Sequence, residues 1–143
     1  MPDVNKSQTV SYSQEQMYRL VNDVRRYPEF IPWCVSSHIL SATEDEVRAT
    51  LAFSRGGFYK SFTTLNRLQP HQMIEIRLIN GPFKHLEGFW RFEPVDHDRC
   101  RVSLDLEFEF SSRWIQMMFG PVFHPIANKL VEAFCERAKV VYR

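Results

Sequence analysis

The sequence predicts a single α+β domain in which a curved antiparallel sheet of about seven strands closes around a long C-terminal helix. Three observations predict this fold: the chain has 143 residues, which is the length of one domain; apolar and polar residues alternate through its middle; and its last segment returns to helical spacing. Because 44% of the residues are hydrophobic, the composition excludes a disordered chain. No uncharged apolar stretch reaches the roughly 18 residues that a membrane-spanning helix needs.

The N-terminal segment predicts one strand followed by one helix. We expect the strand at residues 4–10. Ser13 and Gln16 then have the spacing of a capping box, which marks the start of a helix. The apolar residues that recur at helical spacing after it are Met17, Leu20, Val21 and Val24. We expect the helix to end at residues 25–28, because the residue before Pro28 resists the helical conformation.

Residues 35–110 predict six strands, each with one dry and one wet face. The clearest alternation places apolar side chains at every second position, namely at Val102, Leu104, Leu106, Phe108 and Phe110. Turn-forming residues separate the strands near positions 44, 56, 70, 81 and 97. A sheet with this pattern is antiparallel and covered on one side only.

Residues 112–142 predict the covering helix. Its apolar stripe consists of Ile115, Met118, Val122, Ile126, Leu130, Phe134, Ala138 and Val141. Pro121 and Pro125 each remove a backbone hydrogen bond, so we expect this helix to be bent or split near Gly120.

Charge and cysteine content narrow the classes of function. A net charge of +1 lacks the strong basic excess typical of nucleic-acid-binding domains, and we expect no DNA partner. Three widely spaced cysteines favour reduced thiols, and the polar N-terminus is unlike a signal peptide, so we expect a cytoplasmic protein. Cys34 and His38 are the one close pair of soft metal ligands, but four residues on a strand span about 13 Å, so we expect no metal site. No catalytic motif is present, and we expect no catalytic residue.

The aromatic residues raise the question of whether they fill the core completely. Gly88 lies between Leu86 and Trp90 on the predicted dry face, where it leaves a gap that either a ring fills or a cavity uses as one wall. The segment at residues 27–33 carries four large apolar side chains and two prolines, and is either a packed connector or the rim of an apolar pocket. Met73, Met117 and Met118 are either core filler or an adaptable lining for an apolar ligand.

Three segments of the chain resemble one known family. They are residues 24–34 (VRRYPEFIPWC), residues 81–92 (GPFKHLEGFWRF), and residues 108–110 (FEF) followed by 119–123 (FGPVF). In this order they resemble the coenzyme Q-binding proteins of the START-like, polyketide cyclase superfamily, whose bacterial members are also described as ribosome association toxins. The resemblance implies a helix-grip fold, with residues 1–143 forming one START-like lipid-binding domain around a hydrophobic cavity. Pro121 and Pro125 depart from the smooth helix that the family often has after Phe-Gly.

The same resemblance implies a function and its alternatives. The first is a lipid chaperone without catalysis of its own, which binds ubiquinone or a similar polyprenyl lipid, supports respiratory electron transport, and contacts the inner membrane surface or respiratory complexes transiently. No cofactor other than the lipid is implied. The first alternative is a ribosome association toxin that binds the large ribosomal subunit and blocks subunit joining. The second is a cyclase-like enzyme, which would need an acid or base such as Lys60 or His85 inside the cavity.

For the lipid role we expect a lining of inward apolar side chains, because each Å² of apolar surface that a polyprenyl tail withdraws from water contributes about 25 cal/mol. The expected lining residues are Tyr27, Phe30, Trp33, Leu86, Gly88, Trp90, Leu106, Phe108, Met118, Val122, Ile126 and Leu130. The carbonyl oxygens of a quinone need one or two donors, for which the indoles of Trp90 and Trp33 and the hydroxyl of Tyr27 are candidates.

Overall fold

The computed structural model describes residues 3–142 as seven strands, two α-helices and one 3₁₀ helix. In chain order the elements are β1 (Asp3–Val10), α1 (Gln14–Asn22), the 3₁₀ helix η1 (Val24–Glu29), β2 (Cys34–Ala42), β3 (Glu46–Arg55), β4 (Phe58–Gln69), β5 (Met73–Asn80), β6 (Phe83–Asp96), β7 (Arg99–Phe110) and α2 (Arg113–Val141).

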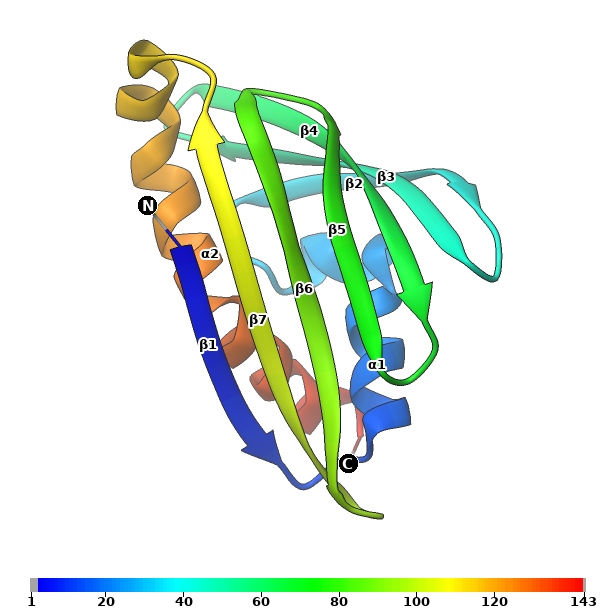
Figure 1. Cartoon of the computed structure of the whole chain (residues 1–143). Coiled ribbons are helices and arrows are strands. Elements are labelled where there is room, and N and C mark those ends of the chain that lie inside the picture. The colour runs from blue at the N-terminus through cyan, green and yellow to red at the C-terminus, as the bar shows by residue number, and fades with distance from the viewer. Residues whose placement is uncertain (1–2, 143) are drawn as a thin grey trace.

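The seven strands form one antiparallel sheet in the order β1-β7-β6-β5-β4-β3-β2. Figure 1 shows the sheet curving, with α2, α1 and η1 on the same side of it. Register shifts occur between β2 and β3, between β4 and β5, and between β6 and β7, and such bulges bend and twist the strands that carry them. The α+β class, the strand number and the sheet wrapped around a C-terminal helix are confirmed.

The capping box at the start of α1 is confirmed, but the end of the helix differs from the prediction. The backbone N–H of Gln16 donates to Ser13 Oγ at 3.2 Å, and the N–H of Ser13 donates to Gln16 Oε1 at 2.9 Å. The helix ends at Asn22, and Pro28 lies inside η1. The helix can end before the predicted position because the carbonyl of Val21, near its last residue, accepts a hydrogen bond from the hydroxyl of Tyr27 and needs no further helical N–H.

The C-terminal helix is continuous, so of the bend or split expected near Gly120 the split does not occur. Pro121 and Pro125 both lie inside α2, at exposed positions where the carbonyls that they leave unbonded can find other donors. The carbonyl of Pro121, which the ring nitrogen of Pro125 cannot satisfy, accepts from Arg55 Nη1 at 3.5 Å.

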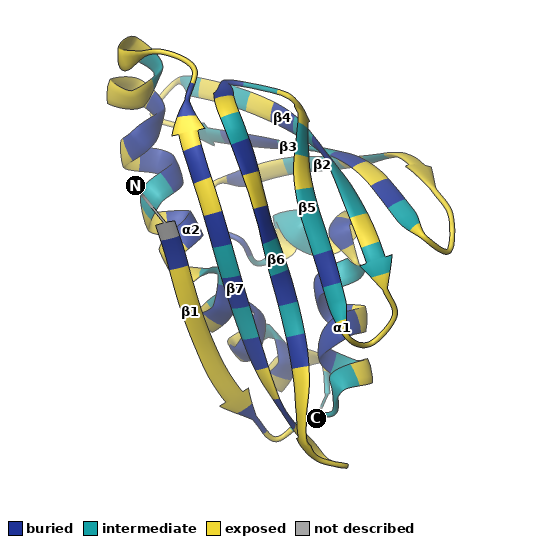
Figure 2. Cartoon of the chain, in the orientation of Figure 1, coloured by how far each residue is buried: buried dark blue, intermediate teal, exposed yellow. Residues whose placement is uncertain are grey.

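Most of the aromatic side chains fill the core. Along β6 and β7 buried residues alternate with more exposed ones, as the colours in Figure 2 show. Phe108 and Phe83 pack on Phe123 of α2 with ring centroids 4.8 and 5.0 Å apart, in edge-to-face geometry. Phe110 and Phe119 extend this group toward the N-terminal end of α2.

Within residues 3–142, no helix combines the length and the hydropathy needed to cross a membrane.

Candidate functional site

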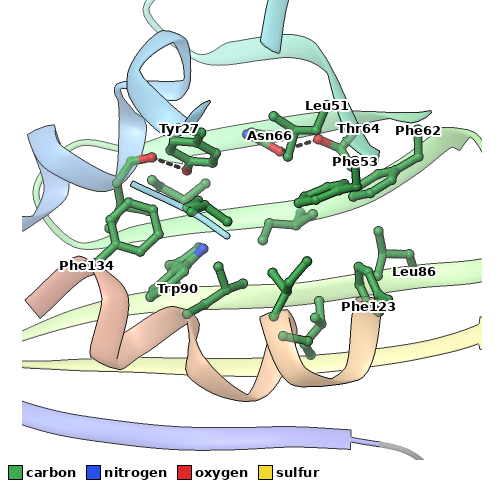
Figure 3. A pocket seen from close by; sticks show the side chains of 18 residues that line it. Tyr27, Leu51, Phe53, Phe62, Thr64, Asn66, Leu86, Trp90, Phe123 and Phe134 are labelled. Atoms are coloured by element: carbon green, nitrogen blue, oxygen red, sulfur yellow. Dashed lines mark hydrogen bonds between the residues drawn. The ribbon is translucent and has the colours of Figure 1, made fainter. Parts of the chain in front are cut away.

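A cavity of about 90 Å³ lies between the sheet and α2. Its wall consists of eighteen side chains from α1, η1 and the segment after it, β3 to β7 and α2, drawn as sticks in Figure 3. Aspartate, glutamate, histidine, lysine, arginine and cysteine are all absent from these eighteen residues. The cavity is therefore an uncharged, mostly apolar space.

Two groups of aromatic rings hold the ends of the cavity. At one end Phe134 packs against Tyr27 and Trp90, with ring centroids 5.3 and 5.2 Å apart and steep interplanar angles. At the other end Phe62 stacks on Phe53 at 5.8 Å. Figure 3 shows the two groups facing each other across the cavity. Edge-to-face and offset-stacked pairs are the favoured arrangements of aromatic rings, so both ends are well packed.

Four lining side chains carry a polar group. On β4, Thr64 and Asn66 follow Phe62 at alternate positions of the inward face, and Thr64 Oγ1 donates to Asn66 Oδ1 at 3.0 Å. Trp90 is 3% exposed, and Figure 3 shows its indole nitrogen toward the cavity. The hydroxyl of Tyr27 already donates to Val21, and burial raises the pKa of Tyr27, so this residue stays neutral.

Half of the twelve residues expected to line the cavity do so. Those that the structure brings together around it are Tyr27, Leu86, Trp90, Leu106, Ile126 and Leu130. Phe30 and Trp33 lie on a neighbouring groove instead. Phe108 and Val122 are buried away from the cavity, and Met118 is 43% exposed on the surface. Helical and strand spacing identify an inward face but not how far along the element the cavity extends.

Gly88 leaves no gap, so the expectation that it forms one wall of the cavity is wrong. A Cβ at this position would lie 2.2 Å from the carbonyl oxygen of Asp105 and 2.9 Å from Leu106 Cδ1. Gly88 pairs with Leu106 across β6 and β7. The glycine therefore permits a close approach of two strands, and the leucine of the partner strand fills the space above it.

Sequence reasoning missed the contribution of β3 and β4 to the cavity. Leu51 and Phe53 of β3 join Phe62, Thr64 and Asn66 of β4 in the wall. One signal was present in the sequence: Thr64 and Asn66 are polar residues in register with Phe62 on a dry face, where a polar residue needs a partner.

A groove of about 390 Å³ lies beside the cavity, between the segment after η1 and α2. Phe30 and Trp33 form part of its wall, and Ile31, Ile126 and Leu130 line both the groove and the cavity. These three side chains therefore form a partition between the two spaces. Trp33 has a left-handed backbone conformation with φ 61°, which is rare for a bulky residue.

Two arginines hold the aromatic rings at the rim of the groove. The guanidinium of Arg55 lies 4.4 Å from the ring centroid of Trp33, and that of Arg137 lies 5.0 Å from the ring centroid of Phe30. Arg137 also binds Glu29 at 2.6 Å, and hydrogen bonds from Arg26 and Arg137 lower the pKa of the Glu29 carboxyl. The expected rim of residues 27–33 therefore forms one side of a mostly apolar groove, and its other side on α2 also carries Lys129, Glu132 and Glu136.

The acid and base candidates lie outside the cavity. Lys60 lines a shallow surface hollow with Tyr59 and Ser111, and His85 is half-buried on β6. Among residues 3–142, no group of three His, Cys, Asp or Glu side chains is arranged to hold a metal ion. Burial raises the pKa of the Cys34 thiol to about 11, which keeps it protonated and unreactive at neutral pH.

The N-terminal end of α2 and the adjacent β3–β4 hairpin form a second candidate surface, which we call the α2 tip. Its exposed apolar members are Tyr59, Trp114, Met117 and Met118, and its basic members are Arg55, Lys60 and Arg113. Figure 2 shows the first turns of α2 almost entirely exposed. Within the described chain, none of the three basic residues forms an ion pair with a carboxylate.

Comparison with known sequences gives one family and two groups of relatives. Residues 10–135 match the family model described as polyketide cyclase / dehydrase and lipid transport. The chain is 48% identical over 142 residues to the ribosome association toxin RatA of Vibrio cholerae, with 99% of each chain covered. It is 30% identical over 144 residues to the coenzyme Q-binding protein COQ10 homolog B of Xenopus laevis, covering 98% of this chain and 59% of that protein.

Comparison with solved structures gives the same fold. A START superfamily protein from Mycobacterium smegmatis superposes with a TM-score of 0.76 at 21% identity, covering 97% of this chain and 98% of the other. The Zhui aromatase/cyclase from a Streptomyces species gives a TM-score of 0.79 at 18% identity, covering 99% and 95%. At these identities the likeness establishes the fold alone.

Proposed function

Because the chain belongs to the family of polyketide cyclases, dehydrases and lipid transport proteins, we propose that it is a ribosome-associating member of that family. In this role it binds the large ribosomal subunit and blocks subunit joining. The observation that carries the proposal is the 48% identity to a ribosome association toxin over 99% of both chains. We place this role above the lipid chaperone role, because the relative with a coenzyme Q-binding name is only 30% identical and the chain spans 59% of its length.

The α2 tip has the chemistry that ribosomal RNA would require. A phosphate backbone attracts lysine and arginine side chains that are not already neutralised, and Arg55, Lys60 and Arg113 meet this condition. Exposed aromatic rings such as those of Tyr59 and Trp114 can stack on unpaired bases. Since the net charge is only +1, attraction to RNA depends on such a local group of cations rather than on the whole molecule.

Sedimentation with purified ribosomal subunits tests the proposal. We expect the protein to travel with the large subunit on a sucrose gradient at low salt and to leave it as salt is raised. Charge at the tip is reversed in the triple variant Arg55→Glu, Lys60→Glu and Arg113→Glu, which should weaken binding more than tenfold. The slope of log affinity against log salt concentration should also become less steep, by the equivalent of about three phosphate contacts.

A matched control reverses three other exposed arginines that form no ion pair, through Arg25→Glu, Arg48→Glu and Arg67→Glu. The control changes the net charge by the same amount and should retain most of the binding. Equal loss in both triple variants would reject the α2 tip as the contact surface. Absence of the wild-type protein from every ribosomal fraction at low salt would reject ribosome association itself.

A second function, binding of a neutral apolar lipid, is favoured by the cavity. Its walls carry no charge, and a mostly apolar groove adjoins it. At about 90 Å³ the cavity is below the roughly 300–1,000 Å³ of ligand pockets, so in its present form it accepts only part of a ligand. We propose that a lipid such as ubiquinone would place its head group here and its tail along the groove. Support of respiratory electron transport and transient contact with a membrane or respiratory complex belong to this second proposal.

Solvent extraction of the protein from its native host, followed by mass spectrometry, tests the lipid role. A quinone recovered in stoichiometric amount is the expected result. Protein that is empty after purification and takes up no added quinone would reject it.

A cyclase-like enzyme is the weakest of the three functions. Such chemistry needs an acid or base next to the bound substrate, and the eighteen lining residues supply neither. The similarity to an aromatase/cyclase is a similarity of fold. We therefore propose that the protein acts by binding and not by catalysis.

A further inference from the structure

We propose that the cavity recognises a carbonyl oxygen of an uncharged ligand through two hydrogen-bond donors, the indole N–H of Trp90 and the side-chain amide of Asn66. This inference rests on the second proposed function, the binding of a neutral apolar ligand, and specifies which part of that ligand enters the cavity and which residues recognise it.

The indole N–H of Trp90 is a donor without an acceptor among the described residues, on a ring that is otherwise buried. Trp90 is 3% exposed, and its N–H makes no hydrogen bond within residues 3–142. The fully buried side-chain polar atoms that lack a partner among the described residues are Asn22 Oδ1, Ser37 Oγ and Arg137 Nε, so the unpaired indole nitrogen of Trp90 is not sealed off but keeps accessible surface. Packing against Phe134 at 5.2 Å and alignment with Phe92 fix the ring, and Figure 3 shows its nitrogen on the cavity side. The donor is therefore held in place for a partner that enters the cavity.

The amide of Asn66 provides a second donor, and Thr64 sets its orientation. Thr64 is 8% exposed, and its hydroxyl donates to Asn66 Oδ1 at 3.0 Å. This bond occupies the acceptor end of the amide and leaves its N–H₂ end without an acceptor among the described residues. Both residues line the cavity. The amide N–H₂ of Asn66 is therefore the donor that this pair presents to a ligand.

The absence of charge in the wall determines the class of ligand. Lysine, arginine and histidine are missing from the eighteen lining residues, so a carboxylate or phosphate that entered would lose its hydration without gaining a counter-ion. The hydroxyl of Tyr27 offers no further donor, because its hydrogen bonds to the carbonyl of Val21. A ketone, quinone or ester oxygen fits these conditions, since it accepts hydrogen bonds and carries no charge.

The volumes indicate how the rest of the ligand is placed. A cavity of about 150 Å³ is known to admit benzene, so one of about 90 Å³ needs to widen before it accepts a six-membered ring. The partition formed by Ile31, Ile126 and Leu130 is the wall that can widen, because beyond it lies the apolar groove of about 390 Å³. An apolar chain attached to the carbonyl-bearing head would extend through this partition into the groove.

The test uses two probes that differ in their carbonyl groups: a benzoquinone carrying a decyl chain, and decylbenzene. The first readout is the ¹⁵N–¹H signal of the Trp90 indole during titration of the wild-type protein. We expect the quinone to shift this proton downfield as a hydrogen bond forms, and decylbenzene to bind without that shift.

The second readout is the affinity of both probes for the variant Asn66→Leu. Loss of one neutral hydrogen bond should weaken quinone binding about three- to tenfold and leave decylbenzene within twofold. The control variant is Thr63→Val, which removes another side-chain hydrogen bond of β4: Thr63 bonds Thr50 at 2.7 Å on the outer face of the sheet. It should leave the affinity for both probes unchanged.

The outcomes separate the recognition from the function on which it rests. If the quinone binds without moving the Trp90 signal, or if Asn66→Leu weakens both probes equally, the proposed carbonyl recognition is wrong although the protein binds apolar ligands. If neither probe binds to the wild-type protein, the lipid-binding function itself is wrong. Because the first readout uses the wild-type protein, the test does not depend on the folding of any variant.

Discussion

Replacement of Gly88 by alanine should destabilise the protein, and the size of the effect follows from one distance. The new Cβ would lie 2.2 Å from the carbonyl oxygen of Asp105 and 3.0 Å from Leu106 Cα, both on the neighbouring strand β7. Backbone atoms of a central strand cannot rotate away as the end of a flexible side chain can. Strands β6 and β7 would therefore have to separate by about 1 Å at this point, or Leu106 would be pushed toward the cavity that it lines.

Two opposing contributions set the magnitude. Overpacking of a well-packed interior costs about 1–3 kcal/mol. The reduced entropy of the unfolded chain on changing glycine to alanine returns about 0.4–1 kcal/mol. We expect a net loss of about 1–2 kcal/mol in the free energy of unfolding, which for a domain of this length lowers the melting temperature by roughly 2–8 °C.

Urea unfolding followed by circular dichroism measures this loss, and Gly120→Ala is the matched control. Gly120 lies inside α2, where a Cβ would meet its nearest neighbour, His124, at an ordinary contact of 3.5 Å. Since alanine is the better helix former, Gly120→Ala should stabilise the protein by about 0.5–1 kcal/mol. The two variants therefore make the same chemical change with opposite expected signs.

A Gly88→Ala protein as stable as the wild type, with an unchanged urea dependence, would contradict this prediction. That result would mean that β6 and β7 accommodate a methyl group without strain, and the gap expected from the sequence would regain support.

Three further predictions concern the cavity, the thiols and the helix. Ala127→Val fills part of the cavity and should raise stability by about 0.5–1 kcal/mol while weakening binding of a decyl benzoquinone at least tenfold by calorimetry; unchanged affinity would place the ligand elsewhere. Burial raises the pKa of the Cys34, Cys100 and Cys135 thiols from 9.0 to about 11, so the folded protein holds these protons more tightly than the unfolded chain. The stability that these thiols contribute is complete below pH 9 and falls as the pH rises from 9 to 11. The urea midpoint is compared with that of a variant lacking the thiols, and an equal midpoint difference at every pH in this range would contradict the prediction. Pro121→Ala restores a helix N–H at an exposed position and should increase the free energy of unfolding by about 1–3 kcal/mol, which a higher melting temperature would show. An unchanged or lower melting temperature would show that the helix needs the proline.

The sequence predicted the elements of the fold because each depends on neighbouring residues. The alternation that ends at Phe108 and Phe110 identifies a strand and its dry face without reference to any other part of the chain. The spacing of Ser13 and Gln16 marks the start of α1 for the same reason. The end of that helix was predicted less well, because the carbonyl of Val21 is satisfied by Tyr27 from the following 3₁₀ turn.

The candidate site was predicted only in part, since it depends on which inward side chains meet. Trp90 and Leu86 were expected to line a cavity and do so, because they occupy the dry face near its centre. Gly88 lies between them on the same face, yet the register of β6 with β7 places Leu106 over it. Asn66 was not expected at all, since its role depends on a hydrogen bond from Thr64 and on the space left by α2.

The amino-acid sequence by itself therefore determined the strands, the helices and the face that each one buries, because periodicity and capping are local properties of the chain. The tertiary structure decided where the interior stays empty and which donors face that space. Packing of this kind depends on strand register, on bulges and on the position of α2 across the sheet, all of which join residues far apart in the sequence.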